Sequence, residues 1–277
     1  MKIRAGYRIT FDSVAPTPIN FLLSVHPDRR GDLITPDVFT PSIDCPVETF
    51  VDSFGNLMSR VLAPPGPVTF SSQFLIEDRG LPEPAAPDAR QMAIEDLPGE
   101  ALQFLLASRY CETDEMSDLA WSLFGGTEPG WQRVEAIVDW THRRLAYDYK
   151  RARPTRTARQ GHDEETGVCR DYAHLAVTLC RCMNIPARYC TGYLGDIGVP
   201  PLPTPMDFHA WFEVYLGGAW HTFDARHNQR RIGRILMARG RDAADVAIST
   251  TFGTTWLTEF SVVTQEVDEA ELLLAAE

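Results

Sequence analysis

Two adjacent glycines, Gly217 and Gly218, constrain the fold of this chain more than any other short feature. They separate two stretches of strand-like residues, 209–216 and 219–224. Two glycines between such stretches are typical of a two-residue β-hairpin turn. A turn of that length fixes the register, because the residues on either side of it must face each other. The sequence therefore predicts an antiparallel pair of strands in which the numbers of facing residues add up to 435.

This register places a histidine beside an aspartate. His209 faces Arg226, and Trp211 faces Asp224. Because side chains alternate between the two faces of a strand, Asp224 is the diagonal neighbour of His209 on one face. Diagonal pairs lie about 7–8 Å apart between backbones, which an imidazole and a carboxylate can bridge. The hairpin therefore predicts a pair formed by His209 and Asp224, and a slip of one residue would separate them.

A helix that is apolar on most of its surface precedes the hairpin. Apolar residues recur with helical spacing over 170–183, and nearly every other face is apolar too, which indicates a buried helix. Cys169 lies where the loop becomes this helix, and the helix dipole and free N–H groups at such a position stabilise a thiolate. On position alone, a small buried residue is the commoner interpretation. A nucleophilic cysteine needs a base with an orienting group, however, and the pair of His209 and Asp224 supplies one.

The other cysteines have a simpler explanation. Cys180 and Cys182 lie inside the helix, where this spacing points the two thiols to different faces. The paired Cys-x-x-Cys motif of structural zinc sites is absent from the sequence. Free cysteine is among the most buried residue types. We therefore expect core packing for these two and for Cys45, Cys111 and Cys190.

The chain divides into a strand-rich first part and a later mixed part. Short stretches of alternating or β-branched residues, interrupted by Pro, Gly and Asp, predict a small antiparallel β domain over 1–80. Residues 81–100 are rich in proline and acidic residues and are interpreted as a linker. Helical patterns follow, and 101–277 is interpreted as one mixed domain. The Pro- and Gly-rich stretch 195–207 is predicted to be a loop that leads into His209 and walls one side of a cleft.

Composition and charge exclude several kinds of partner. The chain has 26 Lys and Arg against 38 Asp and Glu, a net charge of −12, and such a surface is repelled by nucleic-acid backbones. No apolar stretch approaches the roughly 18 residues of a membrane span, and the N-terminus lacks the apolar region of a signal peptide. Six cysteines without an export signal indicate reduced thiols. We therefore expect a cytoplasmic protein without nucleic acid or membrane as partner, of open oligomeric state.

The residues around Cys169 and the hairpin resemble the transglutaminase-like superfamily. In that family Gly-x-Cys opens a helix, a "GIPARYVxGY"-type strand follows, and "HAWVEVYL…W…D" completes a triad. This chain reads "GVC", then "NIPARYCTGYL", then "HAWFEVYLGGAWHTFD". The match is close over 167–225 and looser over 240–246, and the N-terminal strands resemble the β domain of bacterial members. After Asp224 the family often has Pro-Thr, whereas this chain has Ala-Arg.

The resemblance implies an α+β fold in which the nucleophile starts a buried helix that packs on an antiparallel sheet, after a small antiparallel β domain. It implies a papain-like triad with Cys169 as nucleophile, His209 as base and then acid, and Asp224 as orienting carboxylate. The family also has a side-chain oxyanion donor upstream of the cysteine, for which Tyr149 or Tyr147 is the candidate. No cofactor or metal is expected, and no calcium, since the sequence has no EF-hand-like run of ligands.

The expected reaction is amide chemistry through a Cys169 thioester, with a protein or peptide as substrate. Water as acceptor makes a protease or deamidase, and lysine makes a crosslinker. The motifs leave both open, and the bacterial members of the family favour hydrolysis. One alternative is a catalytically idle module that binds a protein in its cleft. Another is acetyl transfer, as in arylamine N-acetyltransferases, whose cysteine lies in a different local motif.

Overall fold

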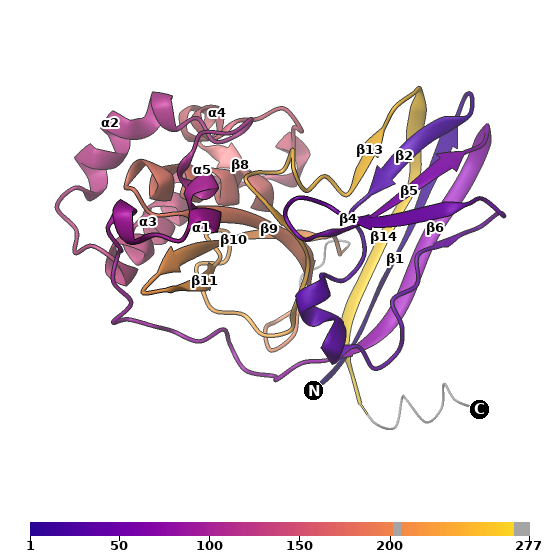
Figure 1. The fold of residues 1–277 in the computed structure, drawn as a ribbon, viewed down its shortest axis with the longest axis horizontal. Coiled ribbons are helices and arrows are strands. Elements are labelled where there is room, and N and C mark those ends of the chain that lie inside the picture. The colour runs from indigo at the N-terminus through magenta and orange to yellow at the C-terminus, as the bar shows by residue number, and fades with distance from the viewer. Residues whose placement is uncertain (202–205, 269–277) are drawn as a thin grey trace.

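The structure is a computed structural model that describes residues 1–201 and 206–268. Figure 1 shows two lobes side by side, one made of strands and the other of helices around a further sheet. Within the two ranges that the structure describes, no helix has both the length and the hydrophobicity needed to cross a bilayer.

The strand-rich lobe is a sandwich of two antiparallel sheets. Its strands are β1 (Lys2–Ser13), β2 (Thr17–Phe21), β3 (Thr40–Pro41), β4 (Val47–Val51), β5 (Leu57–Ala63), β6 (Gly66–Glu77), β13 (Ser249–Thr251) and β14 (Thr255–Val267). The strand order is β14–β1–β6–β3 in one sheet and β13–β2–β5–β4 in the other. Because alternate residues of each strand are apolar, the inner faces share one core, which includes Ile9, Phe21 and Phe70. The antiparallel β domain predicted from the sequence is therefore present.

Two strands of this lobe lie far along the chain from the others. β14 pairs with β1 over its whole length, and β13 pairs with β2. From the sequence these residues are expected in the second domain, because a strand pattern does not show which distant strand it pairs with. The sandwich is therefore discontinuous in sequence.

The second lobe combines helices with a sheet. Its helices are α1 (Gly99–Leu102), α2 (Thr113–Phe124), α3 (Trp131–Arg144), α4 (Ala158–Glu164) and α5 (Cys169–Cys182), and its strands are β7 (Ala146–Tyr147), β8 (Thr166–Gly167), β9 (Ala187–Leu194), β10 (His209–Leu216), β11 (Ala219–Phe223) and β12 (Arg234–Gly240). β7 and β8 form a short parallel pair. The other strands form an antiparallel sheet of order β11–β10–β9–β12, and α5 packs on it.

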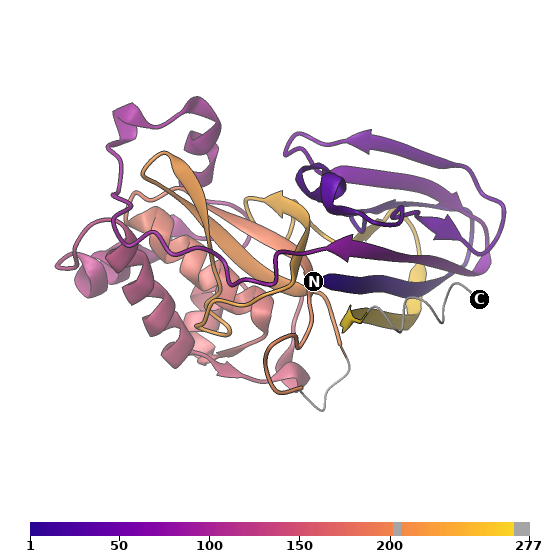
Figure 2. The same cartoon turned by 90° about the horizontal axis from the view of Figure 1, so that it is seen from below.

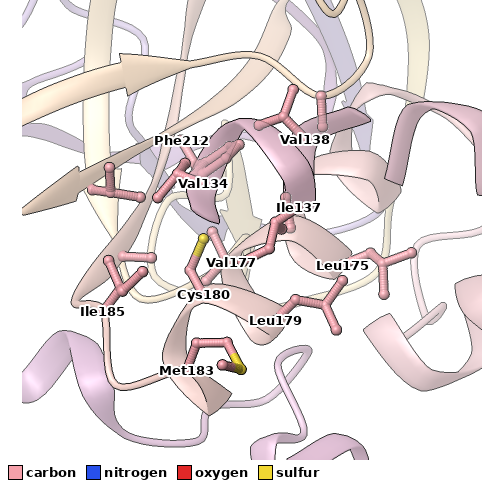
Figure 3. Close-up of a cluster of buried hydrophobic side chains, with 14 of the residues drawn as sticks. Val134, Ile137, Val138, Leu175, Val177, Leu179, Cys180, Met183, Ile185 and Phe212 are labelled. Atoms are coloured by element: carbon pink, nitrogen blue, oxygen red, sulfur yellow. The ribbon is translucent and has the colours of Figure 1, made fainter. Parts of the chain in front are cut away.

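Helix α5 lies at the centre of the second lobe, as its apolar surface predicts. Side chains from α3, α5 and β10 meet in one buried cluster, among them Val134, Val177 and Phe212 (Figure 3). Cys180 lies in the same cluster and is fully buried. The surface that α5 buries therefore fixes the helix rigidly against the sheet.

All six cysteines are free thiols. Cys111, Cys180, Cys182 and Cys190 are buried, and Cys45 is half-buried against the core of the sandwich. The prediction that these five cysteines pack in apolar surroundings is confirmed.

Aromatic rings join the two lobes next to the hairpin. Phe208 contacts Tyr193 of β9 at a ring-centroid distance of 5.1 Å, and it contacts Tyr7 and Phe260 of the sandwich at 6.3 and 5.9 Å. Phe208 directly precedes His209. The sandwich therefore holds the start of β10 in place.

Candidate active site

The start of α5 is built around a buried ion pair. Asp171 accepts a hydrogen bond from the amide of Val168 (2.9 Å) and forms an ion pair with Arg156 (3.0 Å). Both charged side chains are almost fully buried, and the bond to Val168 satisfies a backbone donor at the helix end. A Cβ atom on Gly167 would lie 2.5 Å from the Cβ of Asp171. The Gly-x-Cys motif therefore leaves room for the side chain that caps the helix beginning at Cys169.

Cys169 is the first residue of α5, as predicted, and it is half-buried. Burial is the largest influence on its thiol and raises its pKa to about 12, and the carboxylates of Asp207 and Asp224 act in the same direction. The amide N–H of Ala210 opposes them. Loss of solvent outweighs this donor, so the pKa of the thiol is raised and not lowered as the position at a helix start predicts.

His209 and Asp224 are hydrogen-bonded, as the hairpin register predicts. Leu216 faces Ala219 across the turn. The Nε2 atom of His209 lies 2.8 Å from Oδ2 of Asp224, and both residues are more than nine-tenths buried. The register and the pairing are therefore confirmed.

Asp224 is held by four further donors. Its Oδ2 also accepts from Nδ1 of His227 (3.0 Å) and Nη2 of Arg234 (3.2 Å). Its Oδ1 accepts from the amides of Arg226 (3.0 Å) and His227 (3.1 Å). Burial acts to raise the pKa of Asp224, but His209, His227 and Arg234 hold it well below the usual range. The carboxylate therefore stays ionised. From the sequence, His227 is expected to be solvated or structural and to lack a comparable partner, and these contacts correct that expectation.

The same surroundings keep His209 neutral. Burial lowers the pKa of His209 to about 4, and His227 and Arg234 add to the lowering, while Asp224 opposes it. Because Nε2 donates its proton to Asp224, the other ring nitrogen, Nδ1, is left as an acceptor. The arrangement therefore offers a neutral imidazole base beside an ionised carboxylate.

Arg234 connects Asp224 to the stretch 81–100, which contains Glu83 and is called here the segment between the lobes. Its Nε donates to Glu83 (2.6 Å), and its guanidinium lies over the ring of Trp211, 4.5 Å from the centroid. Glu83 also accepts from the amide of Arg231 (3.0 Å). Figure 2 shows this segment running along the second lobe. Part of the stretch interpreted as a linker is therefore fixed against the site.

A groove of about 530 Å³ reaches the same aspartate. Its lining comes from α3, the end of β11 and the segment between the lobes, and it includes Glu83, Asp139 and Asp224. Neither Cys169 nor His209 lines it. The groove therefore adjoins the carboxylate of Asp224 but not the thiol of Cys169.

The atoms around Asp224 do not form a metal site. Nitrogen and oxygen atoms of His209, Asp224 and His227 lie within 4.8 Å of one another. Oδ2 of Asp224 already accepts three hydrogen bonds, however, and one donor is the guanidinium of Arg234. A cation would be repelled by this buried positive charge. The geometry fits a carboxylate held by its donors.

The two tyrosines suggested as oxyanion donors lie at the edge of the site. Tyr149 is exposed and donates its hydroxyl to Asp207 (3.0 Å), which raises the pKa of Tyr149 to about 12. Tyr147 lies under the guanidinium of Arg226, 3.8 Å from the ring centroid. A role for either tyrosine at an oxyanion stays a prediction. Of the loop predicted to wall the cleft, residues 202–205 lie outside the described residues.

The segment 240–246 is bonded to α5, the helix that begins at Cys169. The amide of Ala243 donates to Nε2 of the buried His174 (3.1 Å), and Arg181 donates to the carbonyl of Arg241. His174 and Arg181 both belong to α5. The segment therefore helps to fix the helix that carries Cys169.

Comparisons with known proteins cover both lobes. The sequence model of the transglutaminase-like superfamily matches residues 117–225, which contain Cys169, His209 and Asp224. A solved structure from Cytophaga hutchinsonii, described as a putative cysteine protease, is 31% identical with a TM-score of 0.81, over 97% of this chain and 91% of that one. An uncharacterized protein of Mycobacterium leprae is 25% identical over 207 residues, which is 72% of this chain and 73% of that protein.

Proposed function

The chain belongs to the transglutaminase-like superfamily, and on that premise we propose that it is a cysteine hydrolase that acts on peptide or carboxamide bonds through a Cys169 thioester. The observation that carries the proposal is the buried hydrogen bond between His209 and Asp224 at the start of β10. The thiol of Cys169 lies at the amide of Ala210, one residue further along that strand. Nucleophile, base and orienting acid are the three parts that acyl transfer by a thiol needs.

In the first half-reaction, Sγ of Cys169 attacks the carbonyl carbon while Nδ1 of His209 takes the thiol proton. The pKa of the thiol is raised and that of the imidazole is lowered, so proton transfer accompanies the attack instead of preceding it. The ionised Asp224 stabilises the imidazolium that forms. His209 then gives the proton to the departing amine, the C–N bond breaks, and the acyl group stays on sulfur as a thioester.

In the second half-reaction, His209 takes a proton from water as the water oxygen attacks the thioester carbonyl. The C–S bond breaks, the acid product leaves, and the proton returns to the sulfur of Cys169. A primary amine in place of water would give a crosslinked product. We favour water, and the description of the Cytophaga relative as a putative cysteine protease supports that choice.

The developing oxyanion is assigned to backbone donors at the start of α5. The amide of Cys169 belongs to the first turn, where helix N–H groups have no partner in the helix. The hydroxyl of Tyr149 is kept as the side-chain candidate, although it donates to Asp207. The substrate is proposed to be a protein or peptide, and the free thiols support a cytoplasmic location.

Mass spectrometry tests the reaction directly. The protein is incubated with a library of glutamine-containing peptides, with and without an added primary amine, beside a Cys169→Ala control. Peptide cleavage identifies a protease, a gain of about 1 Da identifies a deamidase, and amine incorporation identifies a crosslinker. Unchanged peptides under every condition, with Cys169 reduced, would contradict the proposal and favour an idle binding module.

A further inference from the structure

We propose that His227 is a positioning residue of this site, which holds Asp224 and the ring of His209 in the orientation that presents Nδ1 of His209 to the thiol. The inference rests on the proposed role of His209 as the base. The resemblance to the family gave His227 no role, and the inference stands on its contacts alone.

His227 holds both oxygens of the carboxylate. Its Nδ1 lies 3.0 Å from Oδ2 of Asp224, the oxygen that also accepts from His209. Its main-chain amide donates to Oδ1 at 3.1 Å. Two donors from one residue on the two oxygens prevent the carboxylate from rotating about its Cβ–Cγ bond. The lone pair offered to His209 is therefore fixed in direction.

The ring of His227 also restricts the ring of His209. The two imidazole centroids are 4.7 Å apart, with an interplanar angle of 37°. The indole of Trp211 lies nearly parallel to the His209 ring, at 6.5 Å and 14°. Rings packed at these distances limit rotation of His209 about its own Cβ–Cγ bond. His227 therefore acts on the base both through the acid and by direct contact.

The electrostatic influence of His227 gives this role a measurable signature. His227 acts to lower the pKa of His209, so loss of its imidazole is expected to raise that pKa. Among the described residues, the other charged or titratable groups around this cluster are Glu83, Cys169, Arg170, Asp196, Asp207, Arg226, Arg231 and Arg234. None of these groups is altered by a substitution at position 227. A shift in the titration of His209 can therefore be assigned to His227.

Two polar substitutions separate the positioning contact from simple packing. In His227→Asn the side-chain amide nitrogen takes the place of Nδ1 and can still donate to Asp224, whereas in His227→Gln it takes the place of Nε2 and cannot. His221→Asn is the matched control, because His221 lies nearby on β11 but contacts the carbonyl of Leu216 (3.1 Å) and not Asp224. We expect His227→Gln to lower kcat/KM by about 10- to 100-fold, the usual effect of removing an outer hydrogen-bond partner. His227→Asn and the control are expected to keep most of the activity.

The second measurement needs no substrate. Alkylation of Cys169 by iodoacetamide is followed by peptide mass spectrometry from about pH 3 to about pH 9, a range that extends below the pKa of about 4 of His209. The acid limb is expected to move to higher pH in both His227→Gln and His227→Asn, because both lose the imidazole, and to stay in place in the control. Only His227→Gln, which also loses the hydrogen bond to Asp224, is expected to lose activity. Should either variant fail to fold, His227→Ala is measured with added imidazole, which is expected to restore the lost activity.

The outcomes separate this inference from the proposed function. Equal kcat/KM values for the Asn and Gln variants, alkylation profiles of both variants that match the control, or no rescue of His227→Ala by imidazole would overturn the role of His227. A wild-type protein that turns over no peptide, but whose alkylation profile still shifts in His227→Gln, would overturn the hydrolase proposal and support the positioning role. Normal peptide turnover by the wild-type protein, with alkylation profiles unchanged in the His227 variants, would support the hydrolase proposal and overturn the positioning role.

Discussion

The helix side and the sheet side of the candidate site are built in opposite ways. On the helix side the buried ion pair has a structural role, because Asp171 and Arg156 fix the start of α5. Burial there raises the pKa of the Cys169 thiol. On the sheet side Asp224 accepts five hydrogen bonds and stays ionised next to a neutral His209. We therefore expect the helix to position Cys169 and the sheet side to activate it.

The largest expected effect follows from removing either participant in the proton transfer. Cys169→Ala and His209→Ala are each expected to lower peptide turnover by about 1,000-fold or more, since members of a catalytic unit act together. The measurement is kcat/KM on any peptide that the wild-type protein cleaves. Because activation is assigned to the sheet, His209→Ala is also expected to slow alkylation of Cys169. Alkylation at the wild-type rate would break the comparison, because the helix alone would then activate the thiol.

A pair of matched substitutions separates the two sides. Asp224→Asn is expected to lower kcat by about 100-fold or more, because an amide cannot hold the imidazolium and favours the wrong tautomer. Asp171→Asn is expected to lower the free energy of unfolding by about 3 kcal/mol, because Arg156 loses a buried partner, with kcat of the folded protein near that of wild type. Denaturant unfolding and steady-state kinetics check both. The same kinetic loss in both variants would show that the two acids share one role.

The pH dependence of activity tests the sheet side of the site, with an effect of intermediate size. The base must be neutral to accept the thiol proton, and its pKa is lowered to about 4. Activity is therefore expected to persist below the ordinary range of histidine, and to fall only as the pH drops through about 4 and His209 becomes protonated. The check is kcat/KM measured as a function of pH, in short assays on protein that is already folded. An acid limb near the ordinary histidine value of about 6.5 would mean that solvent reaches the imidazole.

The smallest expected effect concerns the segment between the lobes. Glu83→Gln keeps a hydrogen-bond acceptor for Arg234 but removes the negative charge. The electrostatic interaction of Arg234 with Asp224 is then expected to become stronger. We expect kcat/KM to change by about two- to tenfold, the size of one modest hydrogen bond. Asp139→Asn is a suitable control, because Asp139 lines the same groove without contacting Arg234. An equal change in both variants would attribute the effect to the groove and not to the contact.

The sequence allowed the local part of this arrangement to be predicted. Two glycines determine the hairpin register and therefore the pairing of His209 with Asp224, because the two strands that these glycines connect are short and adjacent in the sequence. The start of α5 at Cys169 follows in the same way from the helical pattern. These features depend on residues that are close along the chain.

The parts that could not be predicted depend on long-range folding. Arg234 reaches Asp224 only because the chain after β11 folds back on itself, and Glu83 reaches Arg234 from a stretch that was interpreted as a linker. The raised pKa of Cys169 sums burial with carboxylates from two other segments. No pattern of neighbouring residues contains these contacts.

The pairing of β14 with β1 has a consequence for how the protein is made. On the ribosome, β1 emerges early and keeps one edge open until residues 255–267 have been synthesised. Phe260, one of the rings that steadies Phe208 and hence the strand of His209, belongs to that late segment. A nascent chain therefore carries its cysteine long before it can complete the support of its base. The order of synthesis delays a working site until almost all of the described chain exists.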